Sequence, residues 1–213
     1  MDNLVTRLID QLDTLIPFIG ISRQDVFTLI QEKETLWFPD SAKNLPDTYA
    51  VYRKQINHSS FVLGYSYFEA FLSDLAESIY VARPKMLPKN KKITFDEIVK
   101  AGTYEEAIKT IVGKELHDLF YKNMRDIITY FTDKLQLDWS FDVVEKFAEA
   151  SCLRNCIIHN LGCADARLAM FPEYVLGEPF ELTSSNVHSF GILARREARN
   201  LWEQATTKHL GDV

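Results

Sequence analysis

Apolar side chains recur every three or four residues along most of the chain, which is the period of an amphipathic α-helix. The longest such stretch covers residues 47–82, and Pro84 marks its end. An adjacent stripe of small side chains carries one acid, Glu69, so a second helix could approach closely there. We expect this helix to be the spine of the fold. Its core-facing stripe consists of Phe61, Tyr65, Phe68, Leu72, Leu75 and Ile79.

Two further helices are expected before this long one. Leucine and isoleucine residues at helical spacing predict a first helix over residues 2–16, and Pro17 is expected to end it. Ser22 is a suitable N-cap for a second helix that reaches residue 38.

Two capping boxes follow the long helix. Thr94 and Thr103 are each followed three residues later by a glutamate, so each pair can satisfy free amide groups at a helix start. Gly113 interrupts the apolar pattern further on. We therefore predict helices over residues 94–101, 103–112 and 114–135.

The last third of the chain predicts two helices with a small β-hairpin between them. Ser140 is the expected N-cap of a helix over residues 140–161, and Gly162 is a natural C-terminal stop. Residues 166–183 contain short β-compatible pieces around a Leu-Gly-Glu-Pro turn, which favours a hairpin. A final helix is predicted over residues 185–209. The expected fold class is thus an all-α helical bundle with one minor hairpin.

Composition narrows the classes of function. The 213 residues and 46% hydrophobic content suit one globular domain. A net charge of −6 argues against a generally basic nucleic-acid-binding protein, but it permits a local basic patch. The start of the chain lacks the basic segment of a signal peptide, and no apolar run is long enough to cross a membrane. Three crowded cysteines do not suggest a disulfide framework. We expect a cytoplasmic protein without a membrane partner.

One local basic patch is evident in the segment RPKMLPKNKK, residues 83–92. Its two prolines predict a loop, which is either a solvated connection or a contact for the phosphates of RNA. The basic residues of this loop are Arg83, Lys85, Lys89, Lys91 and Lys92.

Four polar residues interrupt the otherwise apolar helix over residues 140–161. They are Arg154, Asn155, His159 and Asn160. At about 100° per residue, Asn155 and His159 lie on one face, and the long side chain of Arg154 can swing towards it. A buried charge or unsatisfied amide costs several kcal/mol, so these residues need a structural or chemical role.

Two interpretations of this cluster are structural. In the first, it is a buried polar network in which Arg154 pairs with an acid such as Glu69. In the second, it is a metal site built from Cys152, Cys156, His159 and Cys163. The first and last of these are about 16 Å apart along a straight helix, so only neighbouring pairs could share a metal ion.

The third interpretation is chemistry on a phosphodiester. A histidine, with an ordinary pKa near 6.5, is suited to proton transfer at neutral pH, and arginine binds phosphate oxygens with a planar fork. This pair is sufficient for RNA cleavage by internal attack of the 2′-hydroxyl, without a metal or other cofactor. A twofold axis between two copies of the helix would place both pairs around one cleft.

The residues Arg-Asn-Cys-Ile-Ile-His, 154–159, resemble the R-N-x-x-x-H form of the motif of HEPN domains. Their surroundings are similar to that family as well: a long helix carrying SYFEAFLSDL (66–75), the motif on a late helix, and a short hairpin-like piece (177–182) before a final helix. The resemblance covers residues 45–210 of a single domain over 1–213, with 1–44 as an N-terminal helical extension.

The resemblance implies an all-α bundle that forms a homodimer through the motif helix. It also implies a metal-independent endoribonuclease that acts as a toxin, with a partner antitoxin, or as an antiphage-defence effector. Arg154 would bind the scissile phosphate, His159 would act as general acid or base, and Asn155 would orient them. Glu69 and Asn160 are candidate orienting residues. The alternative is a non-catalytic helical interaction or regulatory module of such a system.

Two other groups of residues are weighed and set aside. His58 could face the same cleft, but a surface or capping role is favoured. Arg195, Arg196 and Arg199 form a basic turn of the last helix, which could bind the RNA backbone. A solvated face interleaved with Glu197 and Glu203 is favoured.

Overall fold

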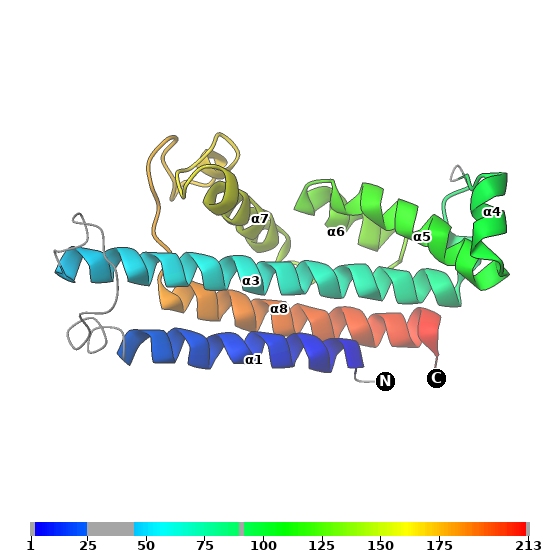
Figure 1. The fold of residues 1–213 in the computed structure, drawn as a ribbon, viewed down its shortest axis with the longest axis horizontal. Helices are drawn as coiled ribbons and strands as arrows, with labels where there is room; N and C mark the ends of the chain where they lie inside the picture. Colours follow the sequence, from blue (N-terminus) through cyan, green and yellow to red (C-terminus); the bar gives the residue numbers. More distant parts are fainter. Residues whose placement is uncertain (1–2, 25–44, 90–91, 212–213) are drawn as a thin grey trace. The chain divides into compact units, whose positions relative to one another are not determined.

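The all-α fold class is confirmed by a computed structural model, which describes residues 3–24, 45–89 and 92–211. Within these ranges no β-strand forms. Short 3₁₀ turns occupy Pro84–Met86 and Leu168–Met170, and a π-helical turn, Thr206–Leu210, extends the last helix. The α-helices in chain order are α1 (Asn3–Gln24), α3 (Leu45–Ala82), α4 (Phe95–Ala101), α5 (Tyr104–Phe120), α6 (Met124–Asp133), α7 (Val144–His159) and α8 (Ser184–Ala205) (Figure 1).

The N-terminal boundaries differ from the prediction. Helix α1 continues through Pro17 to Gln24, so the expected end at Pro17 and the expected N-cap at Ser22 are wrong. A proline removes one N–H donor from a helix, but the other turns keep their hydrogen bonds. The rest of the predicted second helix, residues 25–38, lies outside the described residues.

The two predicted capping boxes do begin helices. Thr94 accepts a hydrogen bond from the Glu97 N–H, and the Glu97 carboxylate accepts one from the Thr94 N–H at 2.8 Å, which completes the box at the start of α4. Thr103 accepts a hydrogen bond from the Glu106 N–H at 3.2 Å at the start of α5.

The predicted break at Gly113 is wrong, as is the single helix over 114–135. Helix α5 passes through Gly113 to Phe120, and α6 begins after Asn123, whose side chain accepts a hydrogen bond from the Asp126 N–H at 3.0 Å. A glycine costs a helix interior only about 1 kcal/mol. An asparagine N-cap, by contrast, stabilises a new helix start, so the boundary falls at Asn123.

The predicted β-hairpin over residues 166–183 is also absent. One isolated bridge joins Cys163 to Pro179. The backbone of 177–180 pairs with the chain directly after α7: the Ala164 N–H donates to Glu178 O at 2.9 Å, and the Phe180 N–H donates to Gly162 O at 3.1 Å. These bonds replace the ones that a second hairpin arm would have supplied.

The chain forms two compact units, and α1, α3, α7 and α8 each contribute residues to both of them. The first unit contains residues 1–8, 68–151 and 194–213. The second contains residues 9–67 and 152–193. The single domain over 1–213 stays a prediction.

The core of the first unit is aromatic. The rings of Phe68 on α3 and Phe147 on α7 are stacked, with centroids 4.5 Å apart. Trp139 meets both rings edge-on, and it meets Phe131 of α6 in the same way. This geometry is favourable for aromatic pairs and joins three helices through one cluster.

The core of the second unit brings α1, α3 and α8 together (Figure 1). Phe190 of α8 packs against Phe61 and Tyr65 of α3, with ring centroids 5.1 and 6.0 Å apart. Gly64 of α3 lies beside the side chains of Leu12 and Leu15 of α1, so these two helices pack closely there. No helix in the described ranges combines the length and hydropathy needed to span a bilayer.

We expect Phe147→Ala to lower the free energy of unfolding by about 3–5 kcal/mol, because it leaves a cavity beside Phe68. Phe141→Ala is the matched control: its ring is fully exposed, so the change should stay below about 0.5 kcal/mol. Urea denaturation followed by circular dichroism measures both. Equal losses in the two variants would contradict the placement of Phe147 in the core.

Candidate functional site

The candidate site lies at the C-terminal end of α7, which ends at His159, two residues before the predicted end at residue 161. The N–H groups of Asn160 and Gly162 both donate to the carbonyl of Cys156 at 3.0 Å, which satisfies an otherwise free helix-end carbonyl. Gly162 has φ +76°, a left-handed conformation that glycine adopts without strain. The start of α7 is four residues later than expected: residues 141–143 form turns, and the helix begins at Val144.

The four polar residues of the motif differ in their exposure to solvent. His159 and Asn160 are exposed, while Arg154 and Asn155 are half-buried. Arg154 Nη1 donates a hydrogen bond to Asn155 Oδ1 at 2.9 Å, so the amide holds the guanidinium in place. The interpretation of His159 as part of a buried polar network is therefore wrong. The arrangement presents an imidazole to solvent on the same helix end as a positioned arginine.

Leu161, the residue after Asn160, is unusual in two respects. Its φ of +54° is left-handed, which costs a residue with a Cβ about 1–2 kcal/mol. Its side chain is also 92% exposed, and that of nearby Ile158 is 45% exposed. Strained backbone of this kind persists where the surrounding structure enforces it, often at functional sites. The sequence does not indicate this feature, because Leu161 fits the apolar period of the helix.

The side chain of His58 on α3 packs against Gly162, in the turn that follows α7. A Cβ at position 162 would lie 3.1 Å from His58 Cε1, so only glycine permits this contact without a shift. The ring is 4% exposed and lies 5.6 Å from the ring of Phe180. The favoured surface or capping role for His58 is therefore wrong: the side chain is a buried support for the turn that ends α7.

Burial leaves the His58 imidazole in an unfavourable place for a charge. Within the part of the chain that the structure describes, Nε2 has no hydrogen-bond partner. Burial, followed by the positive charge of Lys54, lowers the pKa of His58 below its ordinary value of 6.5, and Glu181 partly opposes this. The neutral imidazole is thus the stable form in the folded protein.

The surroundings of Cys156, the cysteine within the motif, disfavour nucleophilic chemistry. Cys156 is buried and its Sγ accepts a hydrogen bond from the Asp165 N–H at 3.4 Å. Burial raises the pKa of this thiol, which disfavours the thiolate needed for nucleophilic attack. Among the described residues, no three His, Cys, Asp or Glu side chains are grouped closely enough to hold a metal ion.

The remaining predicted site residues belong to the first unit, whereas residues 154–160 belong to the second. Glu69 is half-buried on α3. Arg83 is exposed, but its Nε donates a hydrogen bond to His209 O at 3.0 Å, which anchors the start of the basic loop. Lys85, Lys89 and Lys92 are exposed, and Lys91 lies outside the described residues.

Comparison of the chain with protein-family models, with curated proteins and with solved structures finds no significant match.

The burial of His58 predicts a pH dependence of stability. Its pKa is lower in the folded state than in the unfolded chain, so unfolding takes up a proton and stability falls as the pH drops below about 6.5. This one group changes the free energy of unfolding by at most about 1.4 kcal/mol per pH unit. The decrease in the free energy of unfolding ends below the pKa that His58 has in the folded state. We expect His58→Gln to reduce this decrease in the free energy of unfolding at low pH. Urea denaturation at a series of pH values measures it.

His188→Gln serves as the comparison for this experiment, because it removes an exposed histidine from the same unit. This variant shows whether the loss of an exposed imidazole also reduces the decrease in stability at low pH. An identical change of slope in the two variants would rule out burial of His58 as the cause.

Proposed function

We propose that this protein is a metal-independent endoribonuclease of the HEPN type, with its chemistry at the C-terminal end of α7. The observation that carries the proposal is the exposure of His159 on the same helix end as Arg154, which is held by its own hydrogen bond to Asn155. A histidine that only stabilised the fold would be expected to be buried among partners. An exposed one on the same helix end as a positioned cation is available to a substrate.

The proposed reaction needs one proton to be removed and one to be supplied. A base takes the proton of the ribose 2′-hydroxyl, and the 2′-oxygen attacks the neighbouring phosphorus. The bond from phosphorus to the 5′-oxygen then breaks, and that oxygen receives a proton from an acid. The products are a 2′,3′-cyclic phosphate and a free 5′-hydroxyl, so neither a metal nor an oxidant is required.

His159 and Arg154 have distinct roles in this reaction. His159 moves a proton, because imidazole exchanges protons near neutral pH. Arg154 stabilises the negative charge that builds up on the phosphate oxygens, and its fork-shaped donor group matches their geometry. Asn155 limits the freedom of the guanidinium through the 2.9 Å hydrogen bond. Asn160, which is exposed and follows His159 in the chain, would contact the substrate.

A homodimer through the motif helix completes the proposed site. Ile158 and Leu161 expose apolar side chains on either side of His159 and Asn160, and such surface is favourable to bury against a second copy. A twofold axis there would bring two histidines to one cleft, so one could act as base and the other as acid. Separately, the exposed lysines of the 83–92 loop in the first unit, Lys85, Lys89 and Lys92, are candidate contacts for the phosphates of RNA.

Within a cell, such an enzyme would serve as a cytoplasmic toxin or antiphage-defence effector, because unrestrained RNA cleavage halts growth. An antitoxin or a defence-system partner would then control it. These roles rest on the resemblance of residues 154–159 to the HEPN motif.

We expect the wild-type protein to cleave total RNA and tRNA in excess EDTA, leaving 2′,3′-cyclic phosphate ends. His159→Ala and Arg154→Ala should each lower the rate at least about a hundredfold, because each removes a group that acts in the transition state. Gel electrophoresis of labelled RNA and end-group analysis measure both effects. His188→Ala and Arg199→Ala, which remove exposed residues of α8, should retain activity.

The stability of His159→Ala distinguishes chemistry from structure. Because His159 is exposed, its removal should change the free energy of unfolding by no more than about 1 kcal/mol. A catalytic loss in a stably folded variant supports the nuclease. If the wild type leaves RNA intact, or if all variants cut equally well, the non-catalytic interaction module becomes the better account.

We expect Leu161→Gly to weaken the dimer without lowering the stability of the folded chain. Glycine relieves the left-handed strain at this position, but it also removes an exposed apolar side chain from the proposed interface. Sedimentation velocity over a range of concentrations measures the dimer, and thermal denaturation measures the fold. Leu176→Gly, which removes another exposed leucine of the same unit, is the control. A dimer that survives Leu161→Gly unchanged would exclude this interface.

A further inference from the structure

Helix α4, in the first unit, turns its apolar side chains towards solvent. Phe95, Ile98 and Val99 are spaced at i, i+3 and i+4, so they share one face of the helix, about 100° wide. Such a face normally packs on a core, but these side chains are 81%, 47% and 61% exposed, respectively. No residue of α4 is buried. The helix therefore carries an apolar face that nothing in the described part of the chain covers.

The opposite side of α4 attaches the helix to α5 (Figure 1). Lys114 of α5 donates one hydrogen bond to the Glu97 carboxylate at 2.8 Å and another to the carbonyl of Lys92 at 3.3 Å. At about 100° per residue, Glu97 lies almost opposite the apolar face. Hydrogen bonds with Lys114 and with the Thr94 backbone lower the pKa of Glu97 to about 2, so this carboxylate stays charged at neutral pH. These contacts hold α4 with its apolar face outward.

The segment before α4 carries a positive charge that its own acids do not cancel. Lys85, Lys89 and Lys92 are exposed, and no carboxylate of the described residues pairs with any of them. The two acids of α4 are each already paired with a lysine, at 2.7 Å in both cases. Over residues 83–114 bases outnumber acids by eight to four, whereas the whole chain has a net charge of −6. The surplus charge is therefore local and positive.

The lysines and the apolar face are close enough to meet one surface. The hydrogen bond from Lys114 to the Lys92 carbonyl fixes Lys92 beside α4. Lys89 precedes Lys92 by three residues and Lys85 precedes it by seven, so the chain keeps them within about 11 and 25 Å of it. A single extended surface placed against α4 is thus within reach of all three lysines.

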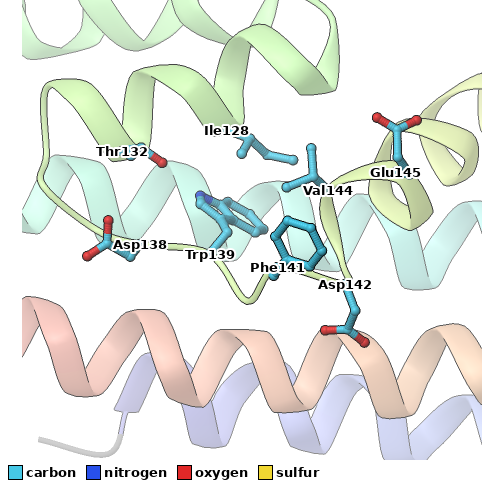
Figure 2. A pocket seen from close by; sticks show the side chains of 8 residues that line it. All are labelled: Ile128, Thr132, Asp138, Trp139, Phe141, Asp142, Val144 and Glu145. Atoms are coloured by element: carbon cyan, nitrogen blue, oxygen red, sulfur yellow. The ribbon is translucent and has the colours of Figure 1, made fainter.

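The cavity of the same unit, by contrast, has no charge that selects a ligand. Figure 2 shows the residues that line it at the turn before α7, and its volume is about 550 Å³. Its acids, Asp138, Asp142 and Glu145, are each paired with at least one base. The turn itself is anchored where the Ser140 N–H donates to Oε1 of Glu197 at 3.0 Å. Glu197 is completely buried, so its interpretation as part of a solvated face is wrong.

We propose that the exposed face of α4, together with Lys85, Lys89 and Lys92, is a docking surface for an anionic lipid bilayer. The apolar side chains of α4 enter the boundary between headgroups and acyl chains, and the lysines meet the anionic headgroups. The expectation of no membrane partner depended on the lack of an apolar run that could cross a bilayer, and contact with its surface needs no such run. This inference does not depend on the proposed ribonuclease activity.

The combination of apolar and basic side chains favours a bilayer over other occupants. An RNA strand would meet the lysines, but Ile98 and Val99 have no aromatic face on which a base could stack. A second copy on a twofold axis would bring two positively charged surfaces together. A peptide segment binds in a groove or along a sheet edge, whereas Phe95 protrudes from the surface. A bilayer accepts protruding apolar side chains and positive charge together.

Co-sedimentation of the full-length protein with phosphatidylcholine vesicles, with and without phosphatidylserine, tests the proposal. We expect binding to the vesicles that contain phosphatidylserine, and this binding should weaken as salt is added. Vesicles of phosphatidylcholine alone should bind much less protein. Failure to bind the anionic vesicles, or equal binding to both kinds, would overturn the proposal.

Two double variants separate the apolar contribution from the charged one. Phe95→Ala/Val99→Ala should weaken binding to the anionic vesicles at least about tenfold, because it removes apolar area that enters the bilayer. Lys89→Gln/Lys92→Gln should also weaken it at least about tenfold, because each lysine near an anionic surface adds to the attraction. Titration of each variant with vesicles measures both effects. Binding that survives either change undiminished would contradict the assignment.

Matched variants elsewhere in the same unit control for the loss of an exposed ring and of exposed charge. Phe141→Ala removes a fully exposed phenylalanine of the turn before α7. Lys122→Gln/Lys134→Gln removes two exposed lysines, one after the C-terminal end of α5 and one after α6. Both should bind vesicles like the wild type, and circular dichroism and melting temperature confirm that each variant is folded. Equal weakening by these controls would remove the evidence for a surface at α4.

The other occupants are tested with the same apolar variant. Anisotropy of a labelled oligoadenylate measures RNA binding, and sedimentation velocity of the protein alone measures self-association. We expect neither to change in Phe95→Ala/Val99→Ala. RNA binding or self-association that is lost in this variant would assign the face of α4 to RNA or to a second copy and overturn the lipid assignment.

Discussion

The apolar stripe of α3 is the constraint on which both units depend, because its side chains form part of each core. Every residue of the stripe, from Phe61 to Ile79, is at most 3% exposed. In the first unit, α7 covers it through the stack of Phe147 on Phe68, and in the second unit α8 covers it through Phe190. Burial of each such side chain stabilises the fold by about 1.5–3 kcal/mol. A change of period within α3 would therefore disrupt the packing of both units.

The end of α7 illustrates how packing exposes the polar residues of the motif. Gly162 lies against the buried ring of His58, and the left-handed backbone at Leu161 and Gly162 turns the chain away from the helix axis. His159 and Asn160, immediately before this turn, consequently face solvent. A buried, neutral histidine thus supports an exposed one. The same element supplies both a stable helix end and the polar groups on which the proposed ribonuclease rests.

Charge is distributed in two ways that the net value of −6 conceals. The 83–92 loop exposes lysines suited to phosphate groups. The acids around Trp139, by contrast, are each paired with a base, so they do not form an open acidic surface.

The sequence by itself determined the helical class, the capping boxes at Thr94 and Thr103, the position of the motif late in the chain, and Gly162 as the stop of α7. These features depend on side-chain period and on hydrogen bonds between residues three or four apart, so they are encoded locally. Tertiary structure alone decided that His58 is buried and that residues 177–180 pair with the chain after α7 and form no hairpin. Each of those outcomes depends on contacts between residues far apart in the chain. The burial of a side chain is set by what packs against it, and a local pattern does not contain that information.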